Sequence, residues 1–317
     1  MLSLGLDIGG SKTEALVLDS AGQEVFRRRY ATVKDDLGSF LERIVFVIDD
    51  VRAALGAGFT IGVCMPGVIV TETGNVKNSN ILVLNGQPFP AMLENACGRK
   101  VAFANDGNCF ALSEAIDGAG REYAVVFGLT LGTGCGGGVV FRRTMHNGRN
   151  CCAGEWGHAS LPRYTPEKDG PAELCYCGQY NCSELFLSGT GLARRFQLRF
   201  GRALTAPEIF AEYTRGDADA RRHIELYQDQ LARALADVVN LLDPDVFVIG
   251  GGLSSLPFLY DGMSERIAAY VFGRSSTTPV VPARHGGASG VRGAAWLGSG
   301  IVSPLSSPPV CDNVGKR

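Results

Sequence analysis

A glycine-rich turn between two apolar, strand-like runs occurs twice in this chain of 317 residues. In the first copy, an apolar run over residues 2–6 leads to Asp7 and the turn 9–12, and a second run covers residues 15–18. In the second copy, residues 123–131 lead to the turn 132–138 and then to residues 139–141. A strand, a glycine turn and a strand form a hairpin. Two such units predict two related α/β halves with a cleft between them.

Each turn is suited to hold a phosphate. Glycines in a tight turn let backbone N–H groups approach an anion closely, and Asp7 at a strand end could hold Mg²⁺ through water. One copy alone would also fit an ordinary hairpin, but the second copy favours two cradles for one phosphate chain. The P-loop pattern is absent. The spacing of Gly132, Gly134 and Gly137 fits a dinucleotide fingerprint, but a strand-like run follows it instead of a helix, which argues against NAD.

Length and composition predict two domains. We place the boundary near residues 117–120, which gives a smaller N-terminal α/β domain over 1–118 and a larger C-terminal α/β domain over 119–297. Residues 298–317 are rich in Ser and Pro and are expected to be disordered, although a segment from about 298 could pack back on the first domain.

The net charge of −2 gives no basic footprint for nucleic acid. No apolar run is long enough for a membrane helix and no signal peptide is visible, so we expect a cytoplasmic protein.

Hydrophobic periodicity predicts the other elements. Strands are expected at 24–30, 59–65, 100–104 and 246–249, with irregular chain over 68–87 and 142–183. Helices are expected at 37–55, 88–96, 109–116, 185–200, 217–242 and 293–297, and one more from about Ser254.

A polar pair, Asn105 and Asp106, ends one strand and begins a helix. A carboxylate there can take a proton from a substrate hydroxyl, and a helix N-terminus favours its ionised form. The alternative is an ordinary helix cap, for which Asn and Asp are preferred. Glu155 and His158 could converge on one polar ligand, with Glu184 as a second acidic candidate.

His158, Cys175, Cys177 and Cys182 supply a full tetrahedral set of zinc ligands. Disulfides are disfavoured in the cytoplasm, and four protein ligands leave no open position, so we expect a structural zinc. Cys151 and Cys152 could compete as ligands, and reduced surface cysteines are the alternative. The turn Gly250-Gly251-Gly252 after a strand suits close approach of a base or phosphate, or is a plain strand–helix turn.

Together these motifs resemble the ROK family of sugar kinases over about residues 3–297. The resemblance implies the actin-like ATPase (ribonuclease H-like) fold. It implies that Asn105 contacts the sugar, that Asp106 is the catalytic base, that Glu155 holds sugar hydroxyls, and that His158 both ligates zinc and faces the sugar. The implied nucleotide-binding residues are Asp7, Gly9, Gly10, Ser11, Lys12, Thr13, Gly132, Thr133, Gly134, Gly250, Gly251 and Gly252.

Three residues depart from the family's motifs. Ser11 stands where Thr is usual, Gly107 where Ala is usual, and Asn181 where the zinc motif has Gly. Ser11 keeps the hydroxyl. Asn tolerates the left-handed backbone conformation that such a glycine adopts, so we expect the zinc turn to form.

The resemblance implies an ATP-dependent hexose kinase that phosphorylates the 6-hydroxyl, with Mg²⁺ and a structural Zn²⁺, acting as a homodimer without nucleic-acid or membrane partners. Residues 76–80 and 84–89 look most like bacterial fructokinases (mannofructokinases), which favours fructose or mannose, with Asn78, Asn105, Glu155, His158 and Glu184 on the sugar. N-acetylglucosamine kinase is the alternative. A sensor that binds sugar and nucleotide without turnover is a second, and another actin-fold ATPase a third. No DNA-binding domain is expected before the first hairpin.

Overall fold

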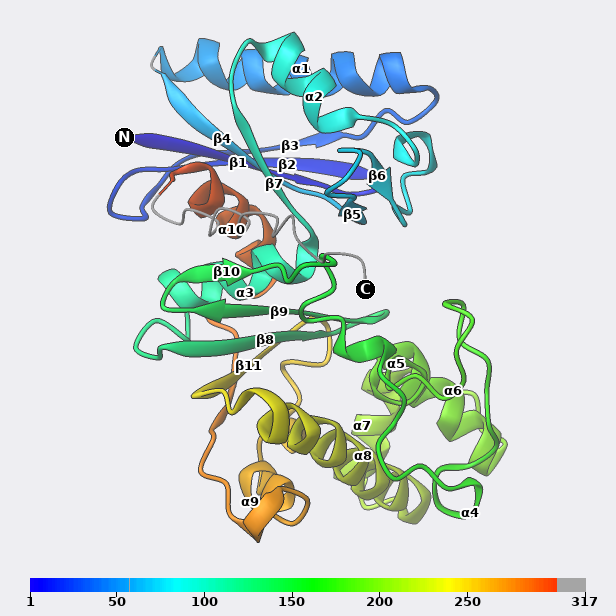
Figure 1. Ribbon diagram of the computed structural model, residues 1–317. Coiled ribbons are helices and arrows are strands. Elements are labelled where there is room, and N and C mark those ends of the chain that lie inside the picture. The colour runs from blue at the N-terminus through cyan, green and yellow to red at the C-terminus, as the bar shows by residue number, and fades with distance from the viewer. Residues whose placement is uncertain (57, 301–317) are drawn as a thin grey trace, which may run out of the picture.

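The computed structural model describes residues 1–56 and 58–300. Two five-stranded sheets lie one above the other (Figure 1). The first sheet has the order β3-β2-β1-β4-β7, with β1 (Leu2–Ile8), β2 (Lys12–Leu18), β3 (Glu24–Ala31), β4 (Phe59–Cys64) and β7 (Val101–Ala104). The second has the order β10-β9-β8-β11-β12, with β8 (Val125–Leu131), β9 (Cys135–Phe141), β10 (Thr144–His146), β11 (Val246–Gly250) and β12 (Val280–Pro282). Two short strands, β5 (Val68–Ile69) and β6 (Val76–Lys77), pair beside the first sheet.

The two sheets have the same topology. In each, three strands follow one another as an antiparallel meander, and two further strands add in parallel to the first of them. The two glycine turns therefore join equivalent strand pairs, β1–β2 and β8–β9. The predicted α/β fold with two related halves is confirmed.

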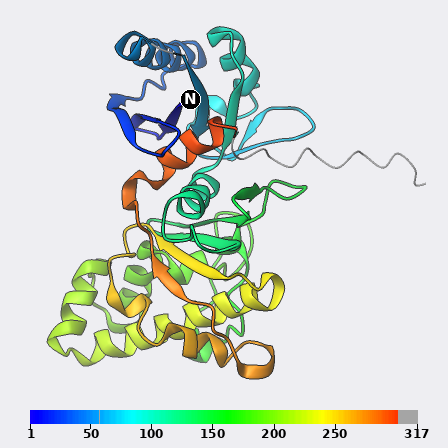
Figure 2. The same cartoon turned by 90° about the vertical axis from the view of Figure 1, so that its left-hand side faces the viewer.

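The outer face of each sheet is covered by helices. On the first sheet these are α1 (Leu37–Leu55) and α2 (Phe89–Cys97), whose apolar sides join the core of β1, β2 and β4. Asp36 caps the start of α1, and Gly56 ends it in the left-handed conformation. The second sheet is covered by a larger set (Figure 2): α5 (Glu184–Leu187), α6 (Gly189–Phe200), α7 (Ala206–Arg215), α8 (Ala218–Leu242) and α9 (Met263–Ala268), with α4 (Pro166–Asp169) beside them.

Two helices fill the space between the sheets, α3 (Asp106–Ile116) and α10 (Ser289–Gly298) (Figure 1). The helix α10 packs on β1 and β4, and α3 packs on β8 and β9. Glycines make these contacts close: a Cβ on Gly5 would lie 2.1 Å from the Val291 carbonyl oxygen, and one on Gly293 would lie 1.8 Å from that of Cys109. The division at residue 118 stays a prediction, and these contacts favour counting α10 with the first half.

Several predicted boundaries move. The strand β9 begins at Cys135 because the glycines 136–138 pair in it with β8, and α3 begins at Asp106 because Asn105 caps it. The predicted helix 185–200 is two helices, divided at Ser188, whose hydroxyl caps the second. The helix predicted from about Ser254 is wrong: Gly251 takes a positive φ and a 3₁₀ turn, Pro257–Leu259, precedes α9. The helix α7 was not predicted, and α10 begins at Ser289 rather than at 293.

The predicted disordered tail over 298–317 lies, from residue 301 on, outside the described residues. Within the described residues, no helix combines the length and the apolar character needed to span a membrane.

Candidate active site

The first glycine turn is fixed by hydrogen bonds at Gly9, and its residues 10–12 are open to solvent. The Gly9 N–H donates to the Lys12 carbonyl (2.9 Å), and the Thr32 hydroxyl donates to the Gly9 carbonyl (2.8 Å). No described atom lies within 4 Å of where a Cβ on Gly10 would be, and the side chains of Ser11 and Lys12 are exposed. Thr13 is fully buried with its hydroxyl 3.0 Å from that of Thr32. The structure therefore places Thr13 under the turn, while residues 10–12 present its open side.

The second glycine turn lies against Glu184. The Gly132 N–H donates to the Gly134 carbonyl (3.0 Å), and the Thr133 side chain is exposed. The Cys135 N–H donates to Glu184 Oε2 (2.8 Å), and a Cβ on Gly134 would lie 2.6 Å from that oxygen. Only glycine allows this approach of a carboxylate to the turn. Glu184 is thus positioned at the predicted phosphate turn.

The third glycine turn adjoins the second. A Cβ on Gly251 would lie 2.6 Å from the Leu131 carbonyl oxygen, which also accepts the Leu253 N–H (2.9 Å). Gly250 packs against the Phe110 ring, and no described atom lies within 4 Å of where a Cβ on Gly252 would be. Two backbone turns that the sequence separates by more than 100 residues therefore form one surface, with Gly252 open to a ligand.

Asp106 stands at the start of α3 beside other carboxylates. Asn105 accepts the Asn108 N–H (2.8 Å) and so caps the helix, while Asp106 is exposed in the first turn. Burial raises the pKa of Asp7 to about 6, and the nearby charge of Asp106 adds to this shift. Burial likewise raises the pKa of Glu155, against the effect of His158 and with a contribution from Asp106. Asp106 therefore lies close enough to both Asp7 and Glu155 for its charge to raise their pKa values.

A small cavity of about 70 Å³ opens beside Asn105. Its polar lining includes Asn108, Asn147 and Cys151, which sequence reasoning missed. Its apolar lining consists of Met65, Val68, Ile69, Phe103 and Ala104. The Asn108 side-chain oxygen is buried without a hydrogen-bond partner among the described residues. An Asn-Gly turn signal at Asn147 was present in the sequence, but only the fold brings it to Asn105.

Asn78 does not line this cavity. It is exposed, follows β6 and has a φ of 58°. Its loop is fixed by a two-way hydrogen bond between Ser79 and Asn85, both of 2.9 Å. The structure does not bring Asn78 into the lining of the cavity, so its contact with sugar stays a prediction.

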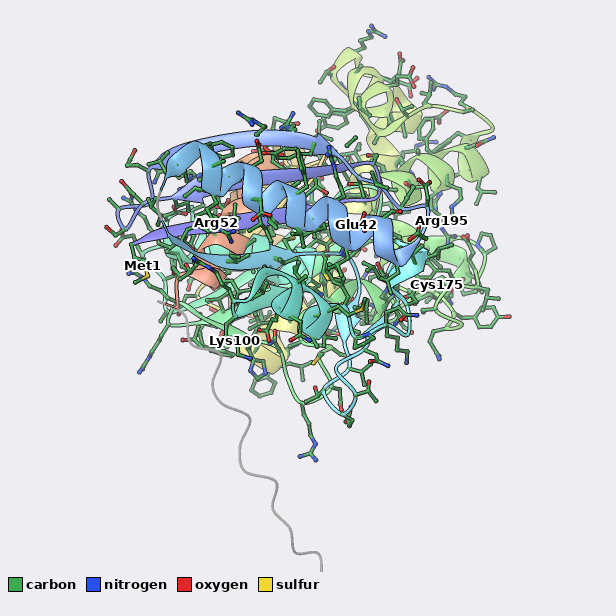
Figure 3. All side chains as sticks on the ribbon, turned by 90° about the horizontal axis from the view of Figure 1, so that it is seen from above. Met1, Glu42, Arg52, Lys100, Cys175 and Arg195 are labelled. Atoms are coloured by element: carbon green, nitrogen blue, oxygen red, sulfur yellow. The ribbon has the colours of Figure 1, made fainter. Side chains whose placement is uncertain are left out.

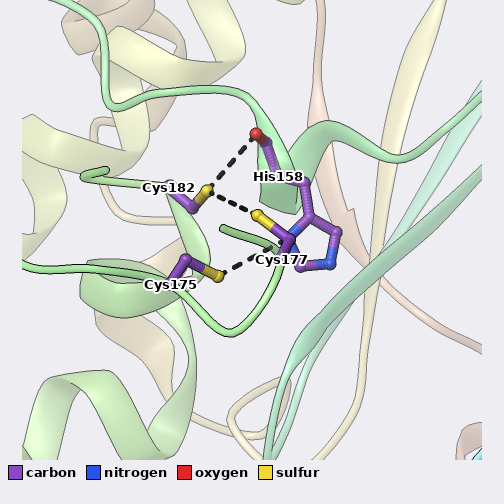
Figure 4. Close-up of side chains that lie close together, drawn as sticks. All are labelled: His158, Cys175, Cys177 and Cys182. Carbon is purple, nitrogen blue, oxygen red and sulfur yellow. Dashed lines mark hydrogen bonds between the residues drawn. The ribbon is translucent and has the colours of Figure 1, made fainter. Parts of the chain in front are cut away.

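The four predicted metal ligands come together (Figure 4). One ligand atom from each of His158, Cys175, Cys177 and Cys182 lies within 4.8 Å of all the others. Cys175 Sγ is 3.8 Å from His158 Nδ1, and the sulfurs of Cys177 and Cys182 are 3.5 Å apart. Ligands about 2.3 Å from a tetrahedral zinc have such separations, so the donor set fits the metal.

The chain around this cluster also fits the prediction. Asn181 has a φ of 58°, the left-handed conformation expected where the family has glycine. Its side-chain oxygen also accepts the Glu173 N–H (2.9 Å). Cys151 lies elsewhere, 3.5 Å from the Thr71 hydroxyl. The other ring nitrogen of His158, Nε2, is 3.0 Å from the Tyr176 hydroxyl, so Nδ1 is the nitrogen that faces the thiols.

Comparison with known proteins now decides the family. The ROK family model matches residues 3–300. The chain belongs to the ROK family. A relative from Escherichia coli O6:H1, N-acetyl-D-glucosamine kinase, is 39% identical over 296 residues, which covers 92% of this chain and 98% of that protein. The same enzyme from Shigella flexneri serotype 5b gives the same identity and coverage.

Solved structures of ROK proteins have the same fold. A ROK hexokinase from Thermus thermophilus superposes with a TM-score of 0.81 at 28% identity, covering 94% of this chain and 98% of that one. A ROK family glucokinase from Streptomyces griseus, solved with glucose and AMPPNP, gives a TM-score of 0.73 at 26% identity, covering 94% and 99%. The predictions of a ROK family sugar kinase and of its actin-like fold are confirmed.

Proposed function

We propose that this ROK kinase transfers the γ-phosphoryl group of MgATP to the 6-hydroxyl of N-acetylglucosamine. The cavity beside Asn105 is the observation that favours this sugar. It has an apolar wall, an unpartnered buried oxygen on Asn108, and a volume of about 70 Å³, which is comparable to two or three water molecules or an acetyl group. An acetamido group has a methyl for the wall and an N–H for Asn108. The curated relatives that are 39% identical are N-acetylglucosamine kinases.

In the proposed reaction, Asp106 accepts the proton of the attacking hydroxyl. Its exposed position in the first turn of α3 leaves the carboxylate open to a substrate, and the helix N-terminus favours its ionised form. The turns at residues 9–12, 132–134 and 250–252 would hold the nucleotide by backbone N–H groups. Phosphoryl transfer depends mainly on such positioning and on charge stabilisation.

The chain offers places for both expected metals. Mg²⁺ neutralises charge on the transferred phosphate when it is bound. Asp7 would hold it. Burial and the nearby charges of Asp106 and Glu14 raise the pKa of Asp7, and a bound cation would stabilise the ionised carboxylate against both effects. The zinc ligands would fix the loop between His158 and Glu184, so that Glu184 stays against Gly134.

Fructose is the second candidate, favoured by the fructokinase-like residues 76–89. In the fold, much of that motif is structural: Val76, Leu84 and Phe89 are buried in the core of the first half. Ser79 and Asn85 bond to each other. These five residues therefore carry little information about the sugar, whereas the exposed Asn78 keeps its predicted contact with it.

The test is a coupled ADP-release assay with MgATP and N-acetylglucosamine, fructose, mannose or glucose. We expect the highest kcat/KM with N-acetylglucosamine, and a loss of about 10²–10⁴-fold in kcat for Asp106→Asn. Asp261→Asn, at another exposed aspartate that belongs to none of the three turns and does not line the cavity, is the matched control and should keep its activity. Higher kcat/KM with fructose would reverse the substrate choice. Sugar binding without any sugar-dependent ADP release would favour a sensor instead.

A further inference from the structure

A second cavity lies among the helices that cover the second sheet. It has a volume of about 170 Å³ and is lined by residues of α4, α5, α6 and α8. These helices gather on the side of the second sheet that faces away from α3 (Figure 1). The cavity shares no lining residue with the one beside Asn105. Nothing in the proposed phosphoryl transfer uses it.

Two buried polar side chains that line this cavity each have at least one nitrogen atom without a hydrogen-bond partner among the described residues. Arg195 is 7% exposed, and its Nε and Nη2 donate no hydrogen bond, although Nη2 lies 3.2 Å from Glu173 in an ion pair. His223 is 4% exposed, and its Nδ1 has no partner. A buried polar atom without a partner is costly, so both groups call for a ligand or water.

The chemistry that these groups need is specific. His223 Nε2 lies 2.9 Å from the Leu192 carbonyl, which can only accept, so Nε2 carries the proton and Nδ1 must receive a hydrogen bond. Burial lowers the pKa of His223 to about 4, which keeps the ring neutral. Arg195 can only donate, and its Nε and Nη2 form the edge that pairs side-on with two oxygens of an anion.

A second cation lines the same cavity. Arg199 is exposed and donates to the Lys168 carbonyl (2.6 Å), but it has no ion pair with any described carboxylate. Asp169 and Gln230 also line the cavity, but the Asp169 carboxylate accepts hydrogen bonds from Gln230 and Arg233 and so has its charge paired. The rest of the wall is largely apolar, with Phe186 under the Arg195 guanidinium at 4.0 Å and with Leu198 and Leu226. These groups suit a ligand that is anionic at one end, carries a hydroxyl and has a short carbon skeleton.

We propose that this cavity binds a small hydroxylated oxyanion, a three- or four-carbon carboxylate or phosphate ester. Its anionic group pairs with Arg195 and Arg199, and its hydroxyl donates to His223 Nδ1. A volume of about 170 Å³ holds about six water molecules, which fits such a molecule and is too small for a nucleotide.

The site is connected to the zinc loop. Arg195 Nη1 donates to the Pro171 carbonyl (2.9 Å), and Glu173, its ion-pair partner, is two residues before Cys175. Figure 3 shows Arg195 and Cys175 at the same end of the molecule. An anion that pairs with Arg195 competes with Glu173 for the guanidinium. Binding of the anion would therefore weaken a contact that holds the loop leading to Glu184.

Calorimetric titration of the full chain with glycerol 3-phosphate, D-glycerate, inorganic phosphate and glycerol tests the site. We expect saturable binding at about millimolar concentration for glycerol 3-phosphate or glycerate, and none for glycerol. In [¹⁵N]histidine-labelled protein, which has four histidines, the Nδ1 signal of His223 should shift on saturation. A response to only one of the two hydroxylated anions would identify the phosphate ester or the carboxylate as the ligand class.

Variants separate the cavity from general surface charge. Arg199→Gln is at an exposed position and should fold, and we expect it to weaken binding by about tenfold or more through the lost charged hydrogen bond. Arg222→Gln is the matched control, because Arg222 is likewise exposed but lies on α8 and does not line the cavity. It should change binding less than about twofold. The proposal is overturned if no anion binds, if glycerol binds equally well, if the two variants lose binding equally, or if the His223 signal is unmoved at saturation.

Discussion

Asp7 is the last residue but one of β1, next to the first glycine turn, and burial and several neighbours shift the pKa of its carboxyl. Burial raises its pKa to about 6, the charge of Asp106 adds to the rise, and a hydrogen bond from the Cys64 thiol opposes it. Below about pH 6 the carboxyl is therefore protonated and is a poor partner for Mg²⁺. Since folding raises this pKa, Asp7 stabilises the fold at low pH, and that contribution is lost as pH rises from about 4 to 6.

The pH dependence of activity should report this group. We expect kcat/KM for MgATP to fall about tenfold per pH unit below about pH 6. In Cys64→Ala the opposing hydrogen bond is gone, so the falling limb should move to higher pH. Asp7→Asn should remove that limb and lower kcat/KM by at least about tenfold. A profile unchanged in Cys64→Ala would argue that Asp7 does not set it.

At the scale of single elements, α3 is placed by glycine contacts. A Cβ on Gly107 would lie 2.3 Å from the Gly137 carbonyl oxygen, and one on Gly138 would lie 2.7 Å from that of Gly107. The residue that follows Asp106 is therefore packed directly against the backbone of β9. The position of the proposed base depends on this contact.

Gly107→Ala should thus disturb both stability and catalysis. Because the obstacle is backbone, α3 must shift, which costs about 1–3 kcal/mol of unfolding free energy and lowers kcat by up to about 100-fold. Thermal unfolding and the ADP-release assay measure the two effects. Gly287→Ala, whose Cβ would meet nothing within 4 Å, is the control and should change neither. Wild-type activity in Gly107→Ala would show that Asp106 tolerates displacement.

The zinc loop is the other element whose order depends on a few atoms. We expect about one zinc per chain in purified protein, and its removal by a chelator should lower the unfolding temperature. Cys177→Ser should lose the metal, and Cys152→Ser, which is exposed but outside the cluster, should keep it. Fewer than about 0.5 zinc per chain in the wild type would contradict a structural zinc.

For the whole molecule, the repeated strand–turn–strand unit was enough to predict two related halves. It could not predict that α3 packs on the second sheet and α10 on the first, because nearly all of α3 is buried and no polar face marks which sheet it covers. A boundary drawn along the chain therefore differs from the division in space. The predicted homodimer stays a prediction, which sedimentation measures.

The candidate site divides in the same way. The clustering of the four zinc ligands was predictable from their residue types and spacing, because tetrahedral zinc needs those ligands together. The catalytic role of Asp106 was implied only by the family resemblance, and it stays a prediction. Asn147 and Cys151 were not predictable, since they reach the cavity only because the chain beyond β10 lies against Val68 and Ile69 there. Asn108 is in the first turn of α3, and only the structure shows that its side chain lines the cavity. The failed helix at Ser254 has a local cause: Gly251 turns the chain through a positive φ, and Pro257 follows too soon for a helix to form between them.

The most direct test of the central claim is to identify the bond that the enzyme makes. NMR of the product from MgATP and N-acetylglucosamine should show phosphate on O6, formed in step with ADP by the wild type. Asp106→Asn should bind the sugar and form almost none of this product. Phosphate on another hydroxyl, or O6 phosphorylation by Asp106→Asn at near the wild-type rate, would contradict the account.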